Sequence, residues 1–312
     1  MLSLKTVTRT QGANQALKDG TVIPRTCTFK FVEVAPLTQA FRRMVRNFEF
    51  DVCELAFTTY LCAKAHGKPI TALPIFLVRG LHHGAIVHNV KVGVHHPRDL
   101  EGRRVGVNRG YTVTTGVWVR GILQDEYDVD LSRVTWVLSG DEHVAEYQPP
   151  PNVVPVDDGK DIAELLIAGD LAAVIGVAVD HPDVMPLIPA PEDAGFDALV
   201  RRGLYPINHL VVVRDELLAD YPDLALDIYT AFAEAKALYV KRLRDGDIHK
   251  PTQADLTYQR VMDITGDPLP YGIDPNRPMI DKLVDHTLSQ RILTAPPRLE
   301  TLFHPSTLDL AS

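Results

Sequence analysis

The segment RVGVNRGYTVTT, residues 104–115, predicts a short strand, a glycine-bearing loop and the start of a helix. We expect the strand over residues 104–107 and the helix through about residue 123. Because the first turn of a helix leaves backbone N–H groups without partners, such a strand–loop–helix unit is typical of a site for an anion. The segment has neither the glycine pattern of dinucleotide sites nor that of P-loops, so it does not predict a nucleotide site.

The rest of the chain repeats this alternation of strands and helices. Apolar or alternating segments predict strands at residues 2–8, 27–34, 50–57, 70–78, 134–138, 171–175 and 207–213. The longest amphipathic helix is expected from Pro222 onward, with that proline in its first turn. Strands that alternate with helices favour an α/β protein with mainly parallel sheets.

The composition argues against several classes of partner. The 312 residues carry a formal net charge of −8, which disfavours a broad surface for nucleic acid or anionic membranes. Cys27, Cys53 and Cys62 match no metal-site or disulfide spacing, and we expect them to be reduced. Residues 1–10 lack the apolar core of a signal peptide, and no later segment is suited to span a bilayer. We therefore expect a cytoplasmic protein with no nucleic-acid or membrane partner.

A second segment, RGLHHGAIVHN at residues 79–89, holds the densest group of chemically active side chains. It follows the apolar residues 70–78 and contains three histidines, which suit proton transfer because their charge changes near neutral pH. If residues 83–88 form a strand, an extended backbone directs His82 and His83 to opposite faces, so both cannot easily serve one site. The alternative is a histidine-rich surface turn without a chemical role.

Two further features carry a resemblance to a known fold. LEGRRVGV at residues 100–107, with Gly110 and Thr112–Thr115, resembles the second lobe of type II periplasmic-binding-protein folds, with sulfonate, taurine and thiamine-precursor binding proteins nearest in pattern. Residues 162–175 fit that lobe, and residues 210–218 fit the return to the first lobe. The resemblance implies a two-lobed α/β fold with a ligand cleft between the lobes. Lobe 1 is expected to comprise residues 1–94 and 206–312, and lobe 2 residues 95–205.

A narrower resemblance concerns FRRMVR at residues 41–46, FDVCE at 50–54, and residues 58–64 and 79–89. These segments resemble the 4,5-dihydroxyphthalate decarboxylase family, whose members are cytoplasmic enzymes of aromatic degradation built on that fold. The resemblance implies an aromatic carboxy-lyase that converts 4,5-dihydroxyphthalate to protocatechuate and carbon dioxide. In the loop over residues 9–20 the family leads us to expect charged side chains, where this chain has Gly12-Ala13-Asn14-Gln15.

Such a reaction needs an anchor for the carboxylate that is kept and an acid to protonate the ring carbon that loses the other. The predicted anchors are the two helix starts and a nearby cation: Thr58, Thr59, Arg109, Tyr111, Thr112, Thr114 and Thr115. The predicted catalytic residues are His82, His83, Glu54, Arg79 and His209, with the two adjacent histidines as first candidates for the acid.

Two of these residues have more than one interpretation. Glu54 lies in an apolar segment, where a carboxylate is costly unless it is paired or functional. It is expected to act as the base for the phenol, to orient a histidine, or to serve as a structural partner of an arginine. His209 is expected either to face the cleft or to be a strand-end residue bonded to the backbone.

The resemblance implies no organic cofactor. The alternative is a catalytic divalent metal held by His82, His83 and Glu54, although the chain has no compact metal motif such as HExxH. The rival function is a non-catalytic binding protein for a small aromatic or sulfonate-like anion. The expected partner is a small aromatic carboxylate substrate. The sequence is also compatible with a homo-oligomer.

Overall fold

The computed structural model describes all 312 residues, and the chain divides into two units. The first unit comprises Met1–Arg79, Ile207–Ile280 and Pro297–Ser312, and the second comprises Gly80–Pro206 and Asp281–Pro296. The first crossover therefore lies at Arg79–Gly80 rather than near His95, where the lobe prediction placed it. Residues 80–94 belong to the second unit because β5 (Ile86–Asn89) pairs with strands of that unit's sheet.

The first unit is built on a five-stranded sheet with the order β2-β1-β3-β11-β4. Its strands are β1 (Leu2–Val7), β2 (Cys27–Phe31), β3 (Val52–Ala56), β4 (Ile70–Arg79) and β11 (Ile207–Arg214). β1 pairs in parallel with β2 and β3, whereas β11 is antiparallel to both β3 and β4. β1, β3 and β4 therefore run in one direction, and their carboxyl ends share one edge of the sheet with the amino end of β11.

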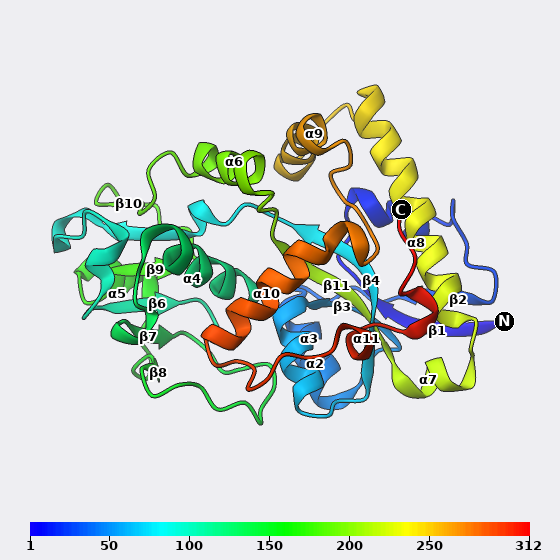
Figure 1. Ribbon diagram of the computed structural model, residues 1–312, viewed down its shortest axis with the longest axis horizontal. Coiled ribbons are helices and arrows are strands. Elements are labelled where there is room, and N and C mark those ends of the chain that lie inside the picture. Colours follow the sequence, from blue (N-terminus) through cyan, green and yellow to red (C-terminus); the bar gives the residue numbers. More distant parts are fainter. The chain divides into compact units, whose positions relative to one another are not determined.

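Helices cover both faces of this sheet (Figure 1). On one face, the buried apolar side chains of α8 (Leu224–Asp245) share a core cluster with Leu73, Ile75 and Leu77, which are alternate residues of β4. On the other face, Phe57 of α3 contacts Phe76 of β4. The remaining helices of this unit are α1 (Gln15–Lys18), α2 (Thr38–Asn47), α3 (Phe57–Ala65), α7 (Asp215–Asp220), α9 (Gln253–Thr265) and α11 (Leu299–Leu302).

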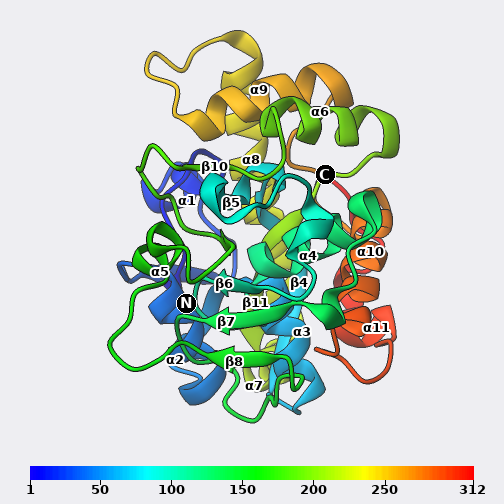
Figure 2. The same cartoon turned by 90° about the vertical axis from the view of Figure 1, so that its left-hand side faces the viewer.

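The second unit contains a six-stranded sheet with the order β10-β5-β9-β6-β7-β8. Figure 2 shows β6, β7 and β8 side by side, and all three run parallel. Besides β5, its strands are β6 (Arg104–Val107), β7 (Thr135–Leu138), β8 (Val153–Pro155), β9 (Ala173–Ile175) and β10 (Val184–Pro186). Its helices are α4 (Thr114–Tyr127), α5 (Ile162–Ala168) and α6 (Pro191–Arg202), while α10 (Arg277–Ser289) begins in the first unit and ends in the second.

The prediction of a strand over residues 83–88 was wrong at its start. His83–Ala85 forms a 3-10 turn, preceded by His82 at φ −104° and ψ 3°, and the strand begins only at Ile86. The two histidines are therefore not in an extended segment, and the argument that sent their side chains to opposite faces does not hold. The glycines on either side, Gly80 and Gly84, belong to this turn region rather than to a strand.

The core contains all three cysteines, each buried and without a disulfide. None of the helices is long and apolar enough to cross a membrane.

Candidate functional site

The shared edge of the first sheet gathers most of the predicted residues of that unit. Arg9 follows the end of β1, Thr58 and Thr59 lie in the first turn of α3 directly after β3, and Arg79 ends β4. His209 is the third residue of β11, which enters the sheet at the same edge. In open α/β sheets, ligands bind outside the carboxyl ends of the strands. This edge is therefore the candidate site of the first unit.

Glu54, His209 and Arg9 form one hydrogen-bonded group at this edge. Nδ1 of His209 lies 2.7 Å from Oε1 of Glu54, and Nε of Arg9 lies 3.2 Å from the same oxygen. The backbone N–H of Arg9 donates to Oε2 of Glu54 at 2.9 Å. Both carboxylate oxygens are thus used, which is the condition under which a fully buried carboxylate is tolerated.

The partners of Glu54 keep it ionised. Burial is the largest influence and acts to raise the pKa of the Glu54 carboxyl, but the hydrogen bond and charge of His209, with the contribution of Arg9, outweigh it and hold the pKa below its ordinary value. An ionised carboxylate beside Nδ1 fixes the ring with its Nδ1–H toward Glu54. The His209 side chain keeps 12% of its surface exposed, so a small molecule can reach it.

A second contact to the same ring nitrogen is weaker. Nη2 of Arg9 lies 3.4 Å from Nδ1 of His209. Because Nδ1 cannot donate to Glu54 and accept from Arg9 at once, the 2.7 Å bond to the carboxylate decides the tautomer. The Arg9 guanidinium therefore adds positive charge beside His209 rather than a hydrogen bond.

The loop after β1 holds Arg9 in place, and this role was missed in the sequence. Asn14 donates from Nδ2 to the backbone carbonyl of Arg9 at 2.8 Å, and Lys18 donates to the carbonyl of Thr8 at 2.8 Å. Residues 12–18, treated above as a loop, form a 3-10 turn and α1. The available signal was the position of Arg9, a cation immediately past a strand end.

The other predicted residues of this unit are buried around the same edge. Thr58 and Thr59 have no exposed surface, and the Arg79 side chain lies with its guanidinium carbon 5.9 Å from the centre of the Phe76 ring. The phenol of Tyr258 is also buried. Burial raises the pKa of Tyr258 to about 12, against the opposing effects of the Arg79 backbone and of the Arg79 and Arg9 charges.

Arg109 has the most ligand-like environment of the predicted residues in the second unit. It follows β6 in a left-handed backbone conformation, with φ 69°, and its backbone N–H donates to Oγ of Ser139 at 2.7 Å. Its Nε is buried and has no hydrogen-bond partner. Burial lowers the pKa of this guanidinium. A non-glycine residue with positive φ and an unused buried donor is typical of a binding position.

The start of helix α4, which suggested an anion site in the sequence, already binds a carboxylate of the chain itself. The Glu142 carboxylate accepts the backbone N–H groups of Tyr111 and Thr112, the second at 3.1 Å, and the Thr112 hydroxyl at 2.6 Å. A Cβ at Gly110 would lie 2.6 Å from Oε2 of Glu142, so glycine is required for this approach. Tyr111 and Thr112 are therefore engaged with Glu142, while the partly exposed Thr115 lies outside this contact.

The two histidines of residues 82–83 lie in the second unit, and His83 is a buried member of an ion-pair group. Its Nε2 lies 3.2 Å and 3.1 Å from the two oxygens of Glu126, and Nη2 of Arg202 lies 2.6 Å from Oε1 of that carboxylate. Burial acts to raise the pKa of Glu126, but His83 and Arg202 outweigh it and lower the pKa. The His83 ring thus joins the 3-10 turn to α4 and α6.

The residues predicted as alternative metal ligands belong to different units. Glu54 lies in the first unit, and His82 and His83 lie in the second. No group of three or more His, Cys, Asp or Glu side chains is arranged to hold a metal ion.

Sequence comparison assigns the family. The chain is 31% identical over 288 residues to the 4,5-dihydroxyphthalate decarboxylase of Comamonas testosteroni, and the alignment covers 87% of each chain. The chain belongs to the 4,5-dihydroxyphthalate decarboxylase family. It is also 31% identical over 173 residues to the decarboxylase of that name from Pseudomonas putida, covering 51% of this chain and 67% of that protein. No protein-family model matches the chain.

Solved structures confirm the predicted fold. A Candida albicans gene product described as having the generic periplasmic binding protein fold superposes with a TM-score of 0.55, at 12% identity and covering 99% of this chain and 98% of that one. The desulfurization enzyme DszB superposes with a TM-score of 0.53, at 13% identity with the same coverage. At these identities the similarity establishes only the fold of this decarboxylase family member. The reaction chemistry has to be argued from the residues of the site.

Proposed function

We propose that the chain removes one carboxylate from 4,5-dihydroxyphthalate to yield protocatechuate and carbon dioxide, with His209 as the proton donor. Family membership supports the reaction, and the hydrogen-bonded Glu54–His209 pair is the observation that carries the assignment of the acid. A partly exposed histidine oriented by a buried carboxylate is a common arrangement for proton transfer.

The proton and the electron pair account for the whole reaction. Electron density from the ring hydroxyl para to the departing carboxylate raises the basicity of the ring carbon that bears it. Nε2 of His209 gives its proton to that carbon, and a C–H bond forms. The bond to the carboxylate then breaks, its electron pair restores the aromatic ring, and carbon dioxide leaves. His209 regains a proton from solvent, so each turnover consumes one proton.

The charge of Glu54 has a defined part in this step. It keeps the His209 ring in one orientation and favours the protonated ring that must be present before the transfer. His82 and His83 remain the other candidates for the acid. We favour His209 because Nε2 of the buried His83 faces Glu126, whereas the oriented ring of His209 keeps exposed surface.

Within the second unit, Arg109 stays a predicted anion-binding residue. Its unused buried donor and its half-buried position suit a group that binds an anion rather than one that exchanges protons.

The test is turnover of 4,5-dihydroxyphthalate by the purified chain in heavy water, with carbon dioxide and protocatechuate measured together. We expect equal amounts of both products and one deuterium on the ring carbon that lost its carboxylate. His209→Asn should lower kcat by about 100- to 10,000-fold. His249→Asn, at an exposed position, is the matched control. Binding of the substrate without release of carbon dioxide would instead support the anion-binding alternative.

A further inference from the structure

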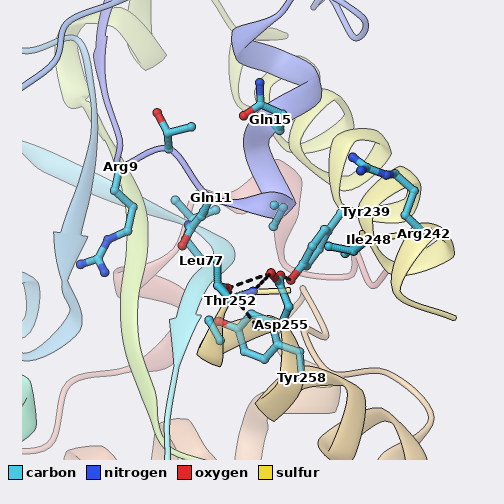
Figure 3. Close-up of a pocket in the computed structure, with 14 residues that line it drawn as sticks. Arg9, Gln11, Gln15, Leu77, Tyr239, Arg242, Ile248, Thr252, Asp255 and Tyr258 are labelled. Carbon is cyan, nitrogen blue, oxygen red and sulfur yellow. Dashed lines mark hydrogen bonds between the residues drawn. The ribbon is translucent and has the colours of Figure 1, made fainter. Parts of the chain in front are cut away.

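The first unit contains a pocket that begins beside Arg9 (Figure 3). It has a volume of about 340 Å³, within the usual range for small-molecule sites. Figure 3 shows Arg9 and Arg242 on opposite sides of it, with Gln11 and Tyr258 between them. The walls come from the loop after β1, from Leu77 of β4, and from α8 and α9.

The polar groups of this pocket favour an anion. Arg9 and Arg242 line it, and the single carboxylate in the lining, Asp255, is already bonded to the Thr252 backbone N–H at 2.7 Å and to the Thr252 hydroxyl at 2.8 Å. Tyr239 donates its hydroxyl to the same carboxylate. The lining thus contributes two guanidinium groups and one carboxylate that is already bonded, while Glu54, outside the lining, holds Arg9 through Nε.

Two side chains offer donors that the protein itself does not use. Nε2 of Gln11 is buried and has no hydrogen-bond partner. Arg9 bonds Glu54 through Nε, but its side chain keeps 43% of its surface exposed, so the outer N–H groups of the guanidinium are accessible. An unpaired buried donor is costly, and an acceptor on a ligand removes that cost.

The pocket is also suited to a ring. Leu77, Tyr239 and Tyr258 give it apolar and aromatic lining. A Cβ at Gly12 would clash with the Tyr239 ring, so the loop packs closely on that side chain. Flat aromatic ligands gain from such surfaces through offset and edge contacts.

Arg9 connects the pocket to the proton donor, since its Nη2 lies 3.4 Å from Nδ1 of His209. We propose that the pocket binds the ring of the substrate and that Arg9, with Gln11, binds the carboxylate that is kept. This proposal rests on the proposed function. In a phthalate the two carboxylates occupy neighbouring ring carbons. A carboxylate on Arg9 therefore places the neighbouring carbon, which must receive the proton, near the His209 ring.

The arrangement defines the substrate class as ortho-dicarboxylates. A ring with a single carboxylate has no second group beside the anchored one. Arg9 holds the retained carboxylate and not the departing one, because an ion pair to the departing group would stabilise the reactant.

Binding of phthalate, which lacks the hydroxyl groups needed for reaction, is the direct test. Ala254 lies in the lining on the exposed first turn of α9, so Ala254→Phe fills the pocket without entering the core. Arg9→Lys keeps the charge but loses the planar pair of donors. We expect each variant to raise the Kd of phthalate about ten- to a hundredfold. Gln253→Phe, on the same turn but outside the lining, should leave the Kd unchanged, and melting temperatures verify folding in all three.

The outcomes distinguish a failure of the pocket assignment from a failure of the proposed function. If 4,5-dihydroxyphthalate is not decarboxylated but phthalate binding depends on Ala254 and Arg9, the pocket assignment stands and the proposed function fails. If turnover occurs and both variants keep the wild-type Kd for phthalate and the wild-type KM, the pocket assignment is wrong. Absence of phthalate binding to the wild-type chain would overturn it as well.

Discussion

Glu54→Gln removes one charge from the centre of the Glu54–His209–Arg9 group while keeping the size of the side chain. In the structure the carboxylate lies 2.7 Å from Nδ1 of His209 and has no exposed surface. Two opposite unit charges about 4 Å apart interact by roughly 4 kcal/mol at an effective dielectric constant of about 20. Loss of that energy from the protonated histidine corresponds to a fall in kcat of about 1,000-fold.

The assay is steady-state formation of protocatechuate from 4,5-dihydroxyphthalate. We expect kcat to fall while the Kd of phthalate changes little, because Arg9 keeps its outer donors. Circular dichroism and the melting temperature show whether the variant folds. The double variant Glu54→Gln/His209→Asn should be no slower than His209→Asn alone, since the two side chains act as a unit. A folded Glu54→Gln variant with kcat within about threefold of wild type would refute the role of Glu54.

Three other predictions follow from the buried charges. The pKa of Glu54 is below its ordinary 4.5 in the folded state, so its stabilising contribution is complete above that value and is lost as the pH falls through the folded pKa. In urea titrations the difference in unfolding free energy between wild type and Glu54→Gln should therefore narrow as the pH falls below 4.5, and a constant difference would contradict the assignment. His83→Asn removes a buried partner of Glu126 and should lower the free energy of unfolding by about 2 kcal/mol, while kcat stays within about threefold of wild type. A loss of turnover without a loss of stability would indicate that His83 is the proton donor. Arg109→Gly relieves the positive φ and should raise the free energy of unfolding by up to about 1 kcal/mol; an unchanged or lower free energy of unfolding would contradict this account of the backbone strain.

Most secondary structure could be predicted from local patterns. The strands at residues 70–78 and 207–213 and the helix after Pro222 appear in the structure as β4, β11 and α8. These segments are long and strongly apolar or strongly periodic, so tertiary contacts agree with the local preference. The turn at His83–Ala85 was missed because three residues are too few to show a period, and the helix α6 was missed because it begins at the last proline of a proline-rich segment.

The candidate residues could be named in the sequence, but their partners could not. Glu54 was identified because a carboxylate in an apolar strand is costly unless it is paired or functional. That its partner is His209, 155 positions later, depends on the pairing of β3 with β11. Likewise, the free N–H groups expected at Tyr111 and Thr112 are occupied by Glu142, which a separate loop brings to them.

The sequence by itself determined the alternation of strands and helices, the family and the set of residues able to move protons or bind a carboxylate. Only the tertiary structure decided which of these residues meet: it joined Glu54 to His209 and Arg9, and His83 to Glu126. The reason is physical. Hydrophobic periodicity is local and is encoded over a few residues, whereas a hydrogen bond between distant side chains exists only after sheet register has brought their backbones within reach.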